Sequence, residues 1–411
     1  MSAGLLAGYK QTEVGVIPGD WRCLPLMELT DPSRPIGYGI VQTGKAIRNG
    51  VKCVRVVDMI DGHIDPDLLI TTTEEISFAY KRTLLREGDV VIALRGKIGA
   101  VAVIQPDLAG ANLTRGVALL SISRSFDSCY LSQYLSSSAG KSAIERNLNG
   151  SALQEIPIAA LRKLPVVVPP TREQRAIATA LSDSEALLAK LDEFIAKKRD
   201  LKQAAMQQLL TGQTRLPGFS GAWEVKRFGE LALPRKDRID PRRAGVQEFC
   251  VELEHIEQGT GCLAGSGSTG EESSLKSVFH AEDVLFGKLR AYLRKYWLAD
   301  RSGVCSTEIW VLVANRNLVA PVFLFQLVTF DPFIEAASTA YGTHMPRSDW
   351  NVVKNYVVAI PKLEEQTAIA TILSDMDTEL AALEARRDKT RALKQGMMQE
   401  LLTGRIRLLA N

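Results

Sequence analysis

The strongest constraint on the fold is an internal repeat. Moving the sequence by about 192 residues lays residues 169–216 on residues 361–408 without a gap, and about 26 of the 48 paired positions are identical. The shared motifs include Glu-Gln, Ala-Ile-Ala-Thr, Leu-Ser-Asp, Leu-Lys-Gln and Leu-Leu-Thr-Gly. Similarity of this extent indicates that one unit has been duplicated within the chain.

Both copies of the repeat predict a long helix. Prolines at 169, 170 and 361 stop any earlier helix, and Gly212 and Gly404 stand where a C-terminal cap is expected. Each helix then has about 40 residues and a length of about 60 Å. Apolar residues recur with the spacing of a coiled-coil seam at Ile177, Leu181, Leu188, Leu191 and Ile195, and at Ile369, Leu373, Met376, Leu380 and Leu383. Since a helix with one apolar seam needs a partner, we expect the two to pack antiparallel as an intramolecular coiled coil.

The segments before the two helices are related more loosely. Each begins with Pro-Gly and a tryptophan, Trp21 or Trp223, which we expect to pack in the core. Short β-rich runs broken by Gly, Asp and Pro follow, and they indicate mixed α/β domains. The predicted fold class is therefore α+β, with two such domains separated by two long antiparallel helices and related by a pseudo-twofold axis. The expected boundaries are 1–165 for the first domain, 166–214 for the first helical spacer, 215–357 for the second domain and 358–411 for the second spacer.

This order of motifs resembles a known family over essentially the full chain. A domain that opens with Ile-Pro-x-Asp-Trp at 17–21 is followed by Pro-Pro-x-x-Glu-Gln at 169–174 and by a helix that ends in Leu-Leu-Thr-Gly at 209–212. The second helix begins with Ile-Pro-Lys-Leu at 360–363 in place of the double proline. The combination is similar to the specificity (S) subunits of type I restriction-modification enzymes.

The resemblance implies a subunit without catalytic activity that reads DNA. Each domain would be a target recognition domain for one half of a bipartite, asymmetric double-stranded site. The helices would dock two copies of an adenine-N6 methyltransferase subunit, and an endonuclease/translocase subunit would complete the complex. S-adenosylmethionine and ATP/Mg would bind those partners, and this chain would hold no cofactor. The candidate docking residues are Glu173, Gln174, Lys202, Gln203, Glu365, Gln366, Lys394 and Gln395.

The composition is compatible with this role but does not require it. The formal net charge is +3, and the six cysteines are scattered without a C-x-x-C pair. A signal peptide and an apolar run of about 20 residues are both absent, so we expect a cytoplasmic protein that does not enter a membrane. Basic residues are clustered locally: residues 32–57 contain five bases and no acid.

Several polar residues have the chemistry that DNA recognition requires. Lys and Arg neutralise phosphates, and Arg, Lys, Asn and Gln can read base edges in the major groove. The candidates in the first domain are Lys45, Arg48, Arg95, Lys97, Asn112, Arg115 and Ser151. The candidates in the second domain are Arg235, Lys236, Lys288, Arg290, Arg294, Lys295, Thr307, His344 and Arg347.

Motifs that resemble catalytic sites are incomplete. Residues 39–46 approach a P-loop but end in Ala46 where Ser or Thr would bind magnesium, and the G-x-G-x-x-G at 265–270 follows a glycine-rich stretch instead of a strand. Asp331-Pro332-Phe333 lacks one proline of an amino-methyltransferase motif, and the four histidines show no metal-ligand spacing, so we expect no metal site. Two other hypotheses stay open: a coiled-coil scaffold that binds only proteins, and an enzyme that acts on nucleic acid.

Overall fold

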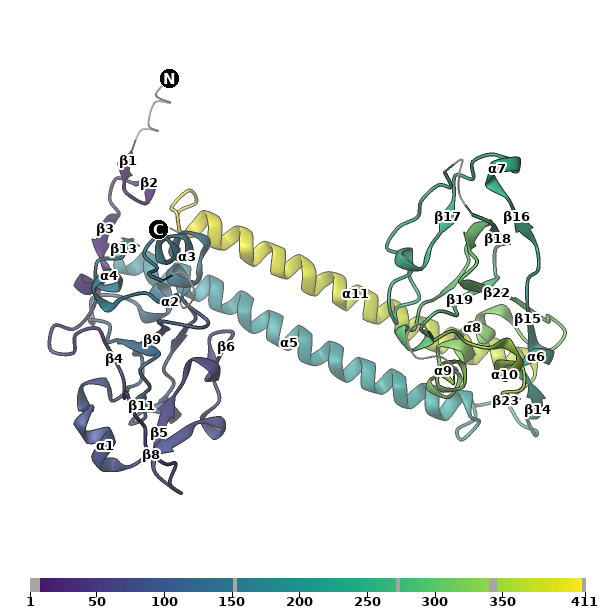
Figure 1. The fold of residues 1–411 in the computed structure, drawn as a ribbon, viewed down its shortest axis with the longest axis horizontal. Coiled ribbons are helices and arrows are strands. Elements are labelled where there is room, and N and C mark those ends of the chain that lie inside the picture. The colour runs from purple at the N-terminus through teal and green to yellow at the C-terminus, as the bar shows by residue number, and fades with distance from the viewer. Residues whose placement is uncertain (1–7, 151–153, 271–273, 340–345, 409–411) are drawn as a thin grey trace. The chain divides into compact units, whose positions relative to one another are not determined.

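The computed structural model describes residues 8–150, 154–270, 274–339 and 346–408, which belong to two compact units. The first unit combines residues 1–190 with residues 387–411, and the second comprises residues 191–386. Helix α5 spans Thr171–Leu210 and helix α11 spans Leu363–Leu401, which confirms the two long helices (Figure 1). Each helix therefore contributes one end to each unit. No helix in the described ranges combines the length and hydrophobicity needed to cross a membrane.

The first unit is a mixed domain of short strands and helices. Its strands are β1 (Tyr9–Thr12), β2 (Gly15–Pro18), β3 (Arg22–Pro25), β4 (Gly37–Tyr38), β5 (Val51–Val54), β6 (Met59–Ile60), β7 (His63–Ile64), β8 (Ile70–Thr72), β9 (Val90–Ala93), β10 (Val101–Val103), β11 (Asn112–Leu113), β12 (Val117–Leu120) and β13 (Pro165–Val168). Its helices besides the long ones are α1 (Glu74–Ala79), α2 (Ser128–Ser136), α3 (Ser138–Glu145) and α4 (Ile158–Arg162). The strands form sheets in the orders β10-β9-β12-β4, β11-β5-β8 and β13-β3, with hairpins β1-β2 and β6-β7.

The second unit is built in the same way. Its strands are β14 (Glu224–Arg227), β15 (Ala232–Pro234), β16 (Arg238–Ile239), β17 (Cys250–Val251), β18 (Lys276–Phe279), β19 (Val284–Gly287), β20 (Tyr296–Leu298), β21 (Gly303–Ser306), β22 (Ile309–Ala314) and β23 (Val357–Ile360). Its short helices are α6 (Phe228–Leu231), α7 (Pro241–Ala244), α8 (Pro321–Thr329), α9 (Asp331–Ser338) and α10 (Trp350–Val353). The sheet orders are β15-β22-β19-β20, β16-β18-β21-β17 and β14-β23.

The central four-stranded sheets of the two units have corresponding topologies. In each sheet one inner strand pairs antiparallel with two neighbours. Strand β9 lies between β10 and β12, and strand β19 lies between β20 and β22. Both units also contain one parallel pair, β5 with β11 and β17 with β21. The duplication inferred from the helices therefore includes the globular parts, and the mixed α+β class is confirmed.

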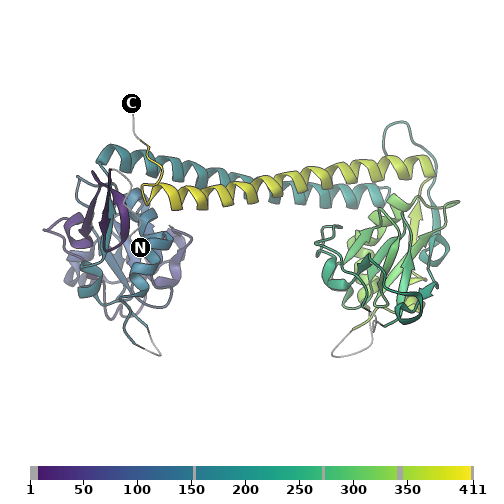
Figure 2. The same cartoon turned by 90° about the horizontal axis from the view of Figure 1, so that it is seen from above.

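Each hydrophobic core includes residues from both long helices. In the first unit, Ile177 and Leu181 of α5 and Leu401 and Leu402 at the end of α11 belong to the cluster that surrounds Trp21. In the second unit, Met206, Leu209 and Leu210 of α5 pack with Ile369 and Leu373 of α11 around Phe228 and Phe286. The ends of the helices are thus integral parts of the folded units (Figures 1 and 2).

A buried glutamate holds the start of α5 to the end of the chain. Glu173, 2% exposed, accepts hydrogen bonds from Trp21 Nε1 at 3.0 Å and from Arg407 Nε and Nη2, both at 2.8 Å. Arg407 also pairs with Asp20 at 2.8 Å, and its guanidinium lies 5.4 Å from the Trp21 ring centroid. We call Glu173, Trp21 and Arg407 the first clasp.

The second unit has an equivalent set of residues. Glu365, 2% exposed, accepts from Arg215 Nε and Nη2, both at 2.6 Å, and the Arg215 guanidinium lies 5.7 Å from the centroid of Trp223. We call Glu365, Arg215 and Trp223 the second clasp. The left-handed turns at Gly212 and Gly404, both with φ of 72°, lead the chain from each helix end toward its clasp arginine.

The glutamines next to the clasp glutamates brace the start of each helix. Gln174 donates to the Pro169 carbonyl at 2.8 Å and accepts from the backbone N–H of Asp127 at 2.9 Å. Gln366 donates to the Pro361 carbonyl at 2.8 Å and accepts from the N–H of Ala320 at 2.9 Å. The prediction that Glu173, Gln174, Glu365 and Gln366 dock a partner is therefore wrong, because all four are buried and bonded within their own unit.

The other docking candidates mostly join elements of the same unit. In the second unit Lys202 forms an ion pair with Asp377 of α11, and Gln203 bonds to Asp331. In the first unit Lys394 pairs with Glu185 of α5 at 2.7 Å. Lys202 and Lys394 thus connect the helices instead of presenting free charges. Gln395 is exposed, so it stays a candidate docking residue.

Candidate nucleic-acid interface

In the first unit, three loops meet beside the central sheet. The N–H of Leu94 donates to the Gly116 carbonyl at 2.8 Å, and the N–H of Ile156 donates to the Leu94 carbonyl at 2.9 Å. Arg95 and Arg115 next to these bonds are exposed. A Cβ atom added at Gly116 would lie 3.2 Å from Arg95 Nε, so glycine lets the arginine side chain cross the backbone there.

A basic loop joins this group. The Ile40 carbonyl accepts from the N–H of Arg115 at 2.8 Å, and the same loop carries the exposed side chains of Lys45 and Arg48. Among the described residues, Lys45, Arg48, Arg95 and Arg115 form no ion pair. Unpaired cations on neighbouring loops suit a polyanion such as DNA, since they can neutralise phosphates without first breaking an internal contact.

The second unit repeats the backbone bonds of this loop group. The N–H of Lys288 donates to the Glu308 carbonyl at 3.0 Å, and the N–H of Ser348 donates to the Lys288 carbonyl at 2.8 Å. A β-bridge between Leu289 and Arg347 matches the bridge between Arg95 and Glu155 in the first unit. The bonds define which positions of the two units are equivalent.

The equivalent positions carry different side chains. The pairs, first unit before second, are Arg95 and Leu289, Gly96 and Arg290, Arg115 and Thr307, Gly116 and Glu308, and Glu155 and Arg347. None of the five pairs conserves the residue type, although the backbone bonds around them are the same. One scaffold thus presents two chemically different surfaces.

The remaining DNA candidates differ in how far they are exposed. Lys97, Lys236 and Arg347 are exposed, while Lys288, Arg290, Arg294 and Thr307 are half-buried in the loop group. The Arg347 guanidinium is paired with Glu308 at 2.9 Å. Ser151 and His344 lie outside the described residues.

Three candidates are wrong because their side chains are used inside the fold. Asn112 is fully buried and bonds to Thr83 and to Ser77. Lys295 Nζ donates to the carbonyls of Leu253 at 2.6 Å and Ile256 at 3.0 Å. Arg235 donates three hydrogen bonds to Asp283, the shortest at 2.8 Å.

The Arg235–Asp283 pair has an equivalent in the first unit, where Arg34 contacts Asp89 at 2.8 Å. Arg34 is 9% exposed, so it is not one of the bases that residues 32–57 offer to DNA. Each aspartate also closes a turn by accepting a hydrogen bond from the backbone N–H three residues earlier. Asp89 accepts from Arg86 and Asp283 accepts from His280, both at 2.8 Å. Sequence reasoning missed this pairing, although the recurrence of Arg and Asp at matching places was a usable signal.

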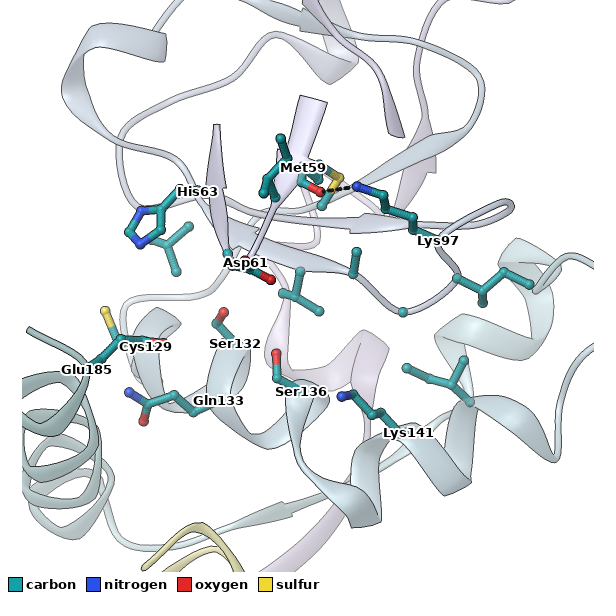
Figure 3. A pocket seen from close by; sticks show the side chains of 18 of the residues that line it. Met59, Asp61, His63, Lys97, Cys129, Ser132, Gln133, Ser136, Lys141 and Glu185 are labelled. Carbon is teal, nitrogen blue, oxygen red and sulfur yellow. Dashed lines mark hydrogen bonds between the residues drawn. The ribbon is translucent and has the colours of Figure 1, made fainter. Parts of the chain in front are cut away.

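A groove of about 1,230 Å³ lies in the first unit beside the loop of Lys97 (Figure 3). The β6-β7 hairpin contributes Asp61 and His63, and α2 contributes Ser132, Gln133 and Ser136, all facing the groove. The acidic and basic residues of its lining are balanced: Asp61, Glu145 and Glu185 with Lys97, Lys141 and Lys394. This balance does not favour a polyanion, so the loops of Arg95 and Arg115 are the better candidate for a nucleic-acid interface.

The segment that resembles a P-loop lacks the required context. Residues 39–46 form a loop that leads into strand β5, whereas a P-loop leads into a helix whose N-terminus receives the phosphates. No group of three or more His, Cys, Asp or Glu side chains within the described ranges is placed to hold a metal ion.

Two equivalent scaffolds with different side chains at matching loop positions are typical of a recognition protein with two unlike reading surfaces. The chain belongs to the family of type I restriction-modification specificity subunits: the family profile, described as the type I restriction modification DNA specificity domain, matches residues 41–198 and 260–391.

Individual relatives agree with this assignment. The chain is 26% identical over 203 residues to the EcoBI specificity subunit of Escherichia coli, an alignment that spans 48% of this chain and 43% of that relative. It is 24% identical to the putative MjaX specificity subunit of Methanocaldococcus jannaschii over 97% of both chains. The crystal structure of the type I S subunit from M. genitalium shares the fold, with a TM-score of 0.55 and 15% identity over 93% of this chain and 96% of that one.

Proposed function

We propose that this chain is the non-catalytic, DNA sequence-recognition subunit of a type I restriction-modification enzyme and that it reads a bipartite, asymmetric target. The observation that carries the proposal is the repeated loop scaffold whose equivalent positions bear different side chains. Equivalent backbones would approach DNA in the same way, while different side chains would select different bases. Two unlike half-sites follow from this arrangement.

The two long helices would form the spacer between the reading surfaces. Ion pairs between α5 and α11 inside each unit support this role. Lys394 pairs with Glu185 in the first unit, and Lys198 pairs with Glu379 at 2.7 Å in the second. We propose that the helices continue this pairing as an intramolecular coiled coil with pseudo-twofold symmetry. Reading two successive major grooves would place the half-sites about one helical turn, roughly 34 Å, apart.

The first test uses the complex reconstituted with two copies of its adenine-N6 methyltransferase partner. We expect target DNA to bind at least about 10³-fold more tightly than random DNA at physiological salt, with an affinity that falls steeply as salt rises. Competition binding at several salt concentrations measures both quantities. Equal affinity for target and random DNA would contradict the proposal.

The methyltransferase would dock on apolar residues exposed on α5. In the second unit Phe194 and Leu201 are 45% and 49% exposed, and seven residues separate them, so they lie on the same helical face. Leu187, in the first unit, precedes Phe194 by the same interval in the sequence and is 40% exposed. Exposed apolar residues at heptad spacing are typical of a helix that receives a partner helix.

We expect Phe194→Glu to weaken assembly with the methyltransferase by at least about 30-fold, the effect of losing an interface hot spot. The melting temperature of the free chain should change little, because Phe194 is 45% exposed and its cation–π contact with Lys198, 5.4 Å from the ring centroid, is a weak surface interaction. Leu233→Glu is the matched control, since Leu233 is also exposed but lies on β15. Sedimentation velocity measures assembly, and full assembly of the Phe194 variant would exclude this docking face.

The endonuclease/translocase subunit would join the assembled methyltransferase, and S-adenosylmethionine and ATP/Mg would bind those partners. A scaffold that binds only proteins is the less favoured function. Its loops would have little use for four cations, on neighbouring segments of one unit, that form no ion pair with any described residue.

A further inference from the structure

The loop between β19 and β20 holds two arginines in an unfavourable backbone conformation. Arg290 has φ of 54° and Arg294 has φ of 50°, in the left-handed region that residues with a side chain rarely adopt. The corresponding loop of the first unit, between β9 and β10, has glycines with positive φ: Gly96 at 69° and Gly99 at 78°. Glycine adopts this conformation without a steric penalty, so its replacement by arginine in the second unit requires a reason.

Arg294 has a reason within the fold. Its guanidinium pairs with Asp331 of α9 at 2.5 Å, and Asp331 also accepts from Gln203 of α5. The side chain therefore anchors the loop to the helices of the second unit. This contact accounts for an arginine in place of glycine at 294, and it gives the Arg294 guanidinium an internal partner.

No contact of the Arg290 side chain with the described residues explains its unfavourable backbone conformation. Its backbone N–H donates to the Pro346 carbonyl at 2.8 Å, but its guanidinium makes no hydrogen bond or ion pair within the described ranges. The neighbouring Arg347 is neutralised by Glu308, so Arg290 offers a guanidinium that has no partner among the described residues of the loop group. Strained residues of this kind concentrate at functional sites, where the binding role maintains them against their conformational cost.

We infer that Arg290 is the residue that reads a guanine in the half-site of the second unit. A guanidinium can donate two parallel hydrogen bonds to O6 and N7 of guanine in the major groove, which identifies a G·C pair. The left-handed backbone fixes the direction in which the side chain leaves the loop. The inference rests on the proposed function and adds to it one residue and one base.

Three variants of Arg290 separate its functions. Arg290→Gly removes both the strain and the guanidinium, Arg290→Ala keeps the strain and removes the guanidinium, and Arg290→Lys keeps the charge without the two-pronged donor. We expect Arg290→Gly to raise the melting temperature of the free chain by roughly 1–4 °C while DNA recognition falls. Arg294→Gly is the matched control: it relieves similar strain but loses the Asp331 contact, so it should not raise the melting temperature.

The binding test uses the reconstituted methyltransferase complex with the target and with duplexes in which each base pair of the second half-site is replaced in turn. All three variants should bind the target roughly 5- to 150-fold more weakly and should no longer distinguish one G·C pair, while the other positions are still distinguished. A uniform loss over all sequences, with a salt dependence reduced by about one ion, would assign Arg290 to a phosphate and overturn the inference. Unchanged discrimination would also overturn it. If the wild-type complex itself does not distinguish target from random DNA, the proposed function fails, and the inference fails with it.

Discussion

Replacing Arg407 by Met should lower the melting temperature of the first unit by about 6–12 °C. The substitution removes the charged partner of Glu173, whose carboxylate is buried, and breaking a buried pair in this way costs about 3 kcal/mol. Methionine keeps much of the apolar stem against Trp21, so the change reports mainly on the lost charge. Calorimetry measures the transition, and hydrogen exchange of β3 and β13 assigns it to the first unit.

Arg405 provides the control for this experiment. It is exposed and pairs with Glu400 at 3.3 Å, so Arg405→Met should change the stability by less than about 0.5 kcal/mol. Equal effects of the two substitutions would show that the first clasp does not hold the chain end to the unit.

The stabilisation by Arg407 should depend on pH. The hydrogen bonds from Arg407 lower the pKa of the Asp20 carboxyl below its usual value. Asp20 therefore stabilises the fold at pH values above its unfolded pKa, and this stabilisation is lost as the pH falls through its folded pKa. The difference between wild type and Arg407→Met should therefore become smaller below about pH 4.

Replacing Arg95 and Arg115 together by Gln should weaken target binding by the reconstituted complex about 100-fold or more. Both side chains are exposed and unpaired among the described residues, and each contact with a base or phosphate contributes roughly 1–3 kcal/mol. The loss should affect only one half-site, because the equivalent loop of the second unit has its own side chains. Binding to duplexes with one or the other half-site scrambled measures this separation.

The matched control is Arg124→Gln, which removes an exposed charge of the first unit outside the loop group. We expect it to change binding little, apart from a small effect on the salt dependence. Loss of both half-sites in an intact complex, or an equal loss from Arg124→Gln, would contradict the assignment of the reading surface to these loops.

The sequence was sufficient to predict the two long helices. The repeat, the prolines before each copy and the glycines at 212 and 404 predicted helices of about 40 residues, and α5 and α11 have 40 and 39. These signals are local: proline and glycine act through backbone geometry, and the apolar seam reflects helical periodicity. The expectation that Trp21 packs in the core is confirmed by its complete burial, whereas Trp223 is only partly buried against the core of its unit.

The functions of individual polar residues could not be predicted in the same way. Glu173 and Gln174 were prominent in the repeat but are buried braces at a helix start. Asn112 and Arg235 have side chains that suit base reading, yet they satisfy internal partners far away in the sequence. Whether a polar side chain is free to bind depends on which distant groups the fold places beside it.

The amino-acid sequence by itself determined the duplication, the extent of the helices and the mixed class of the domains, because each follows from periodicity and local backbone preferences. Only the tertiary structure decided which cations are unpaired, which carboxylates hold the helix starts, and that Arg290 and Gly96 occupy equivalent positions. These properties depend on contacts between residues far apart in the sequence, such as the backbone hydrogen bonds of Leu94 with Gly116 and of Lys288 with Glu308. The local sequence of each loop does not determine which distant loop it meets.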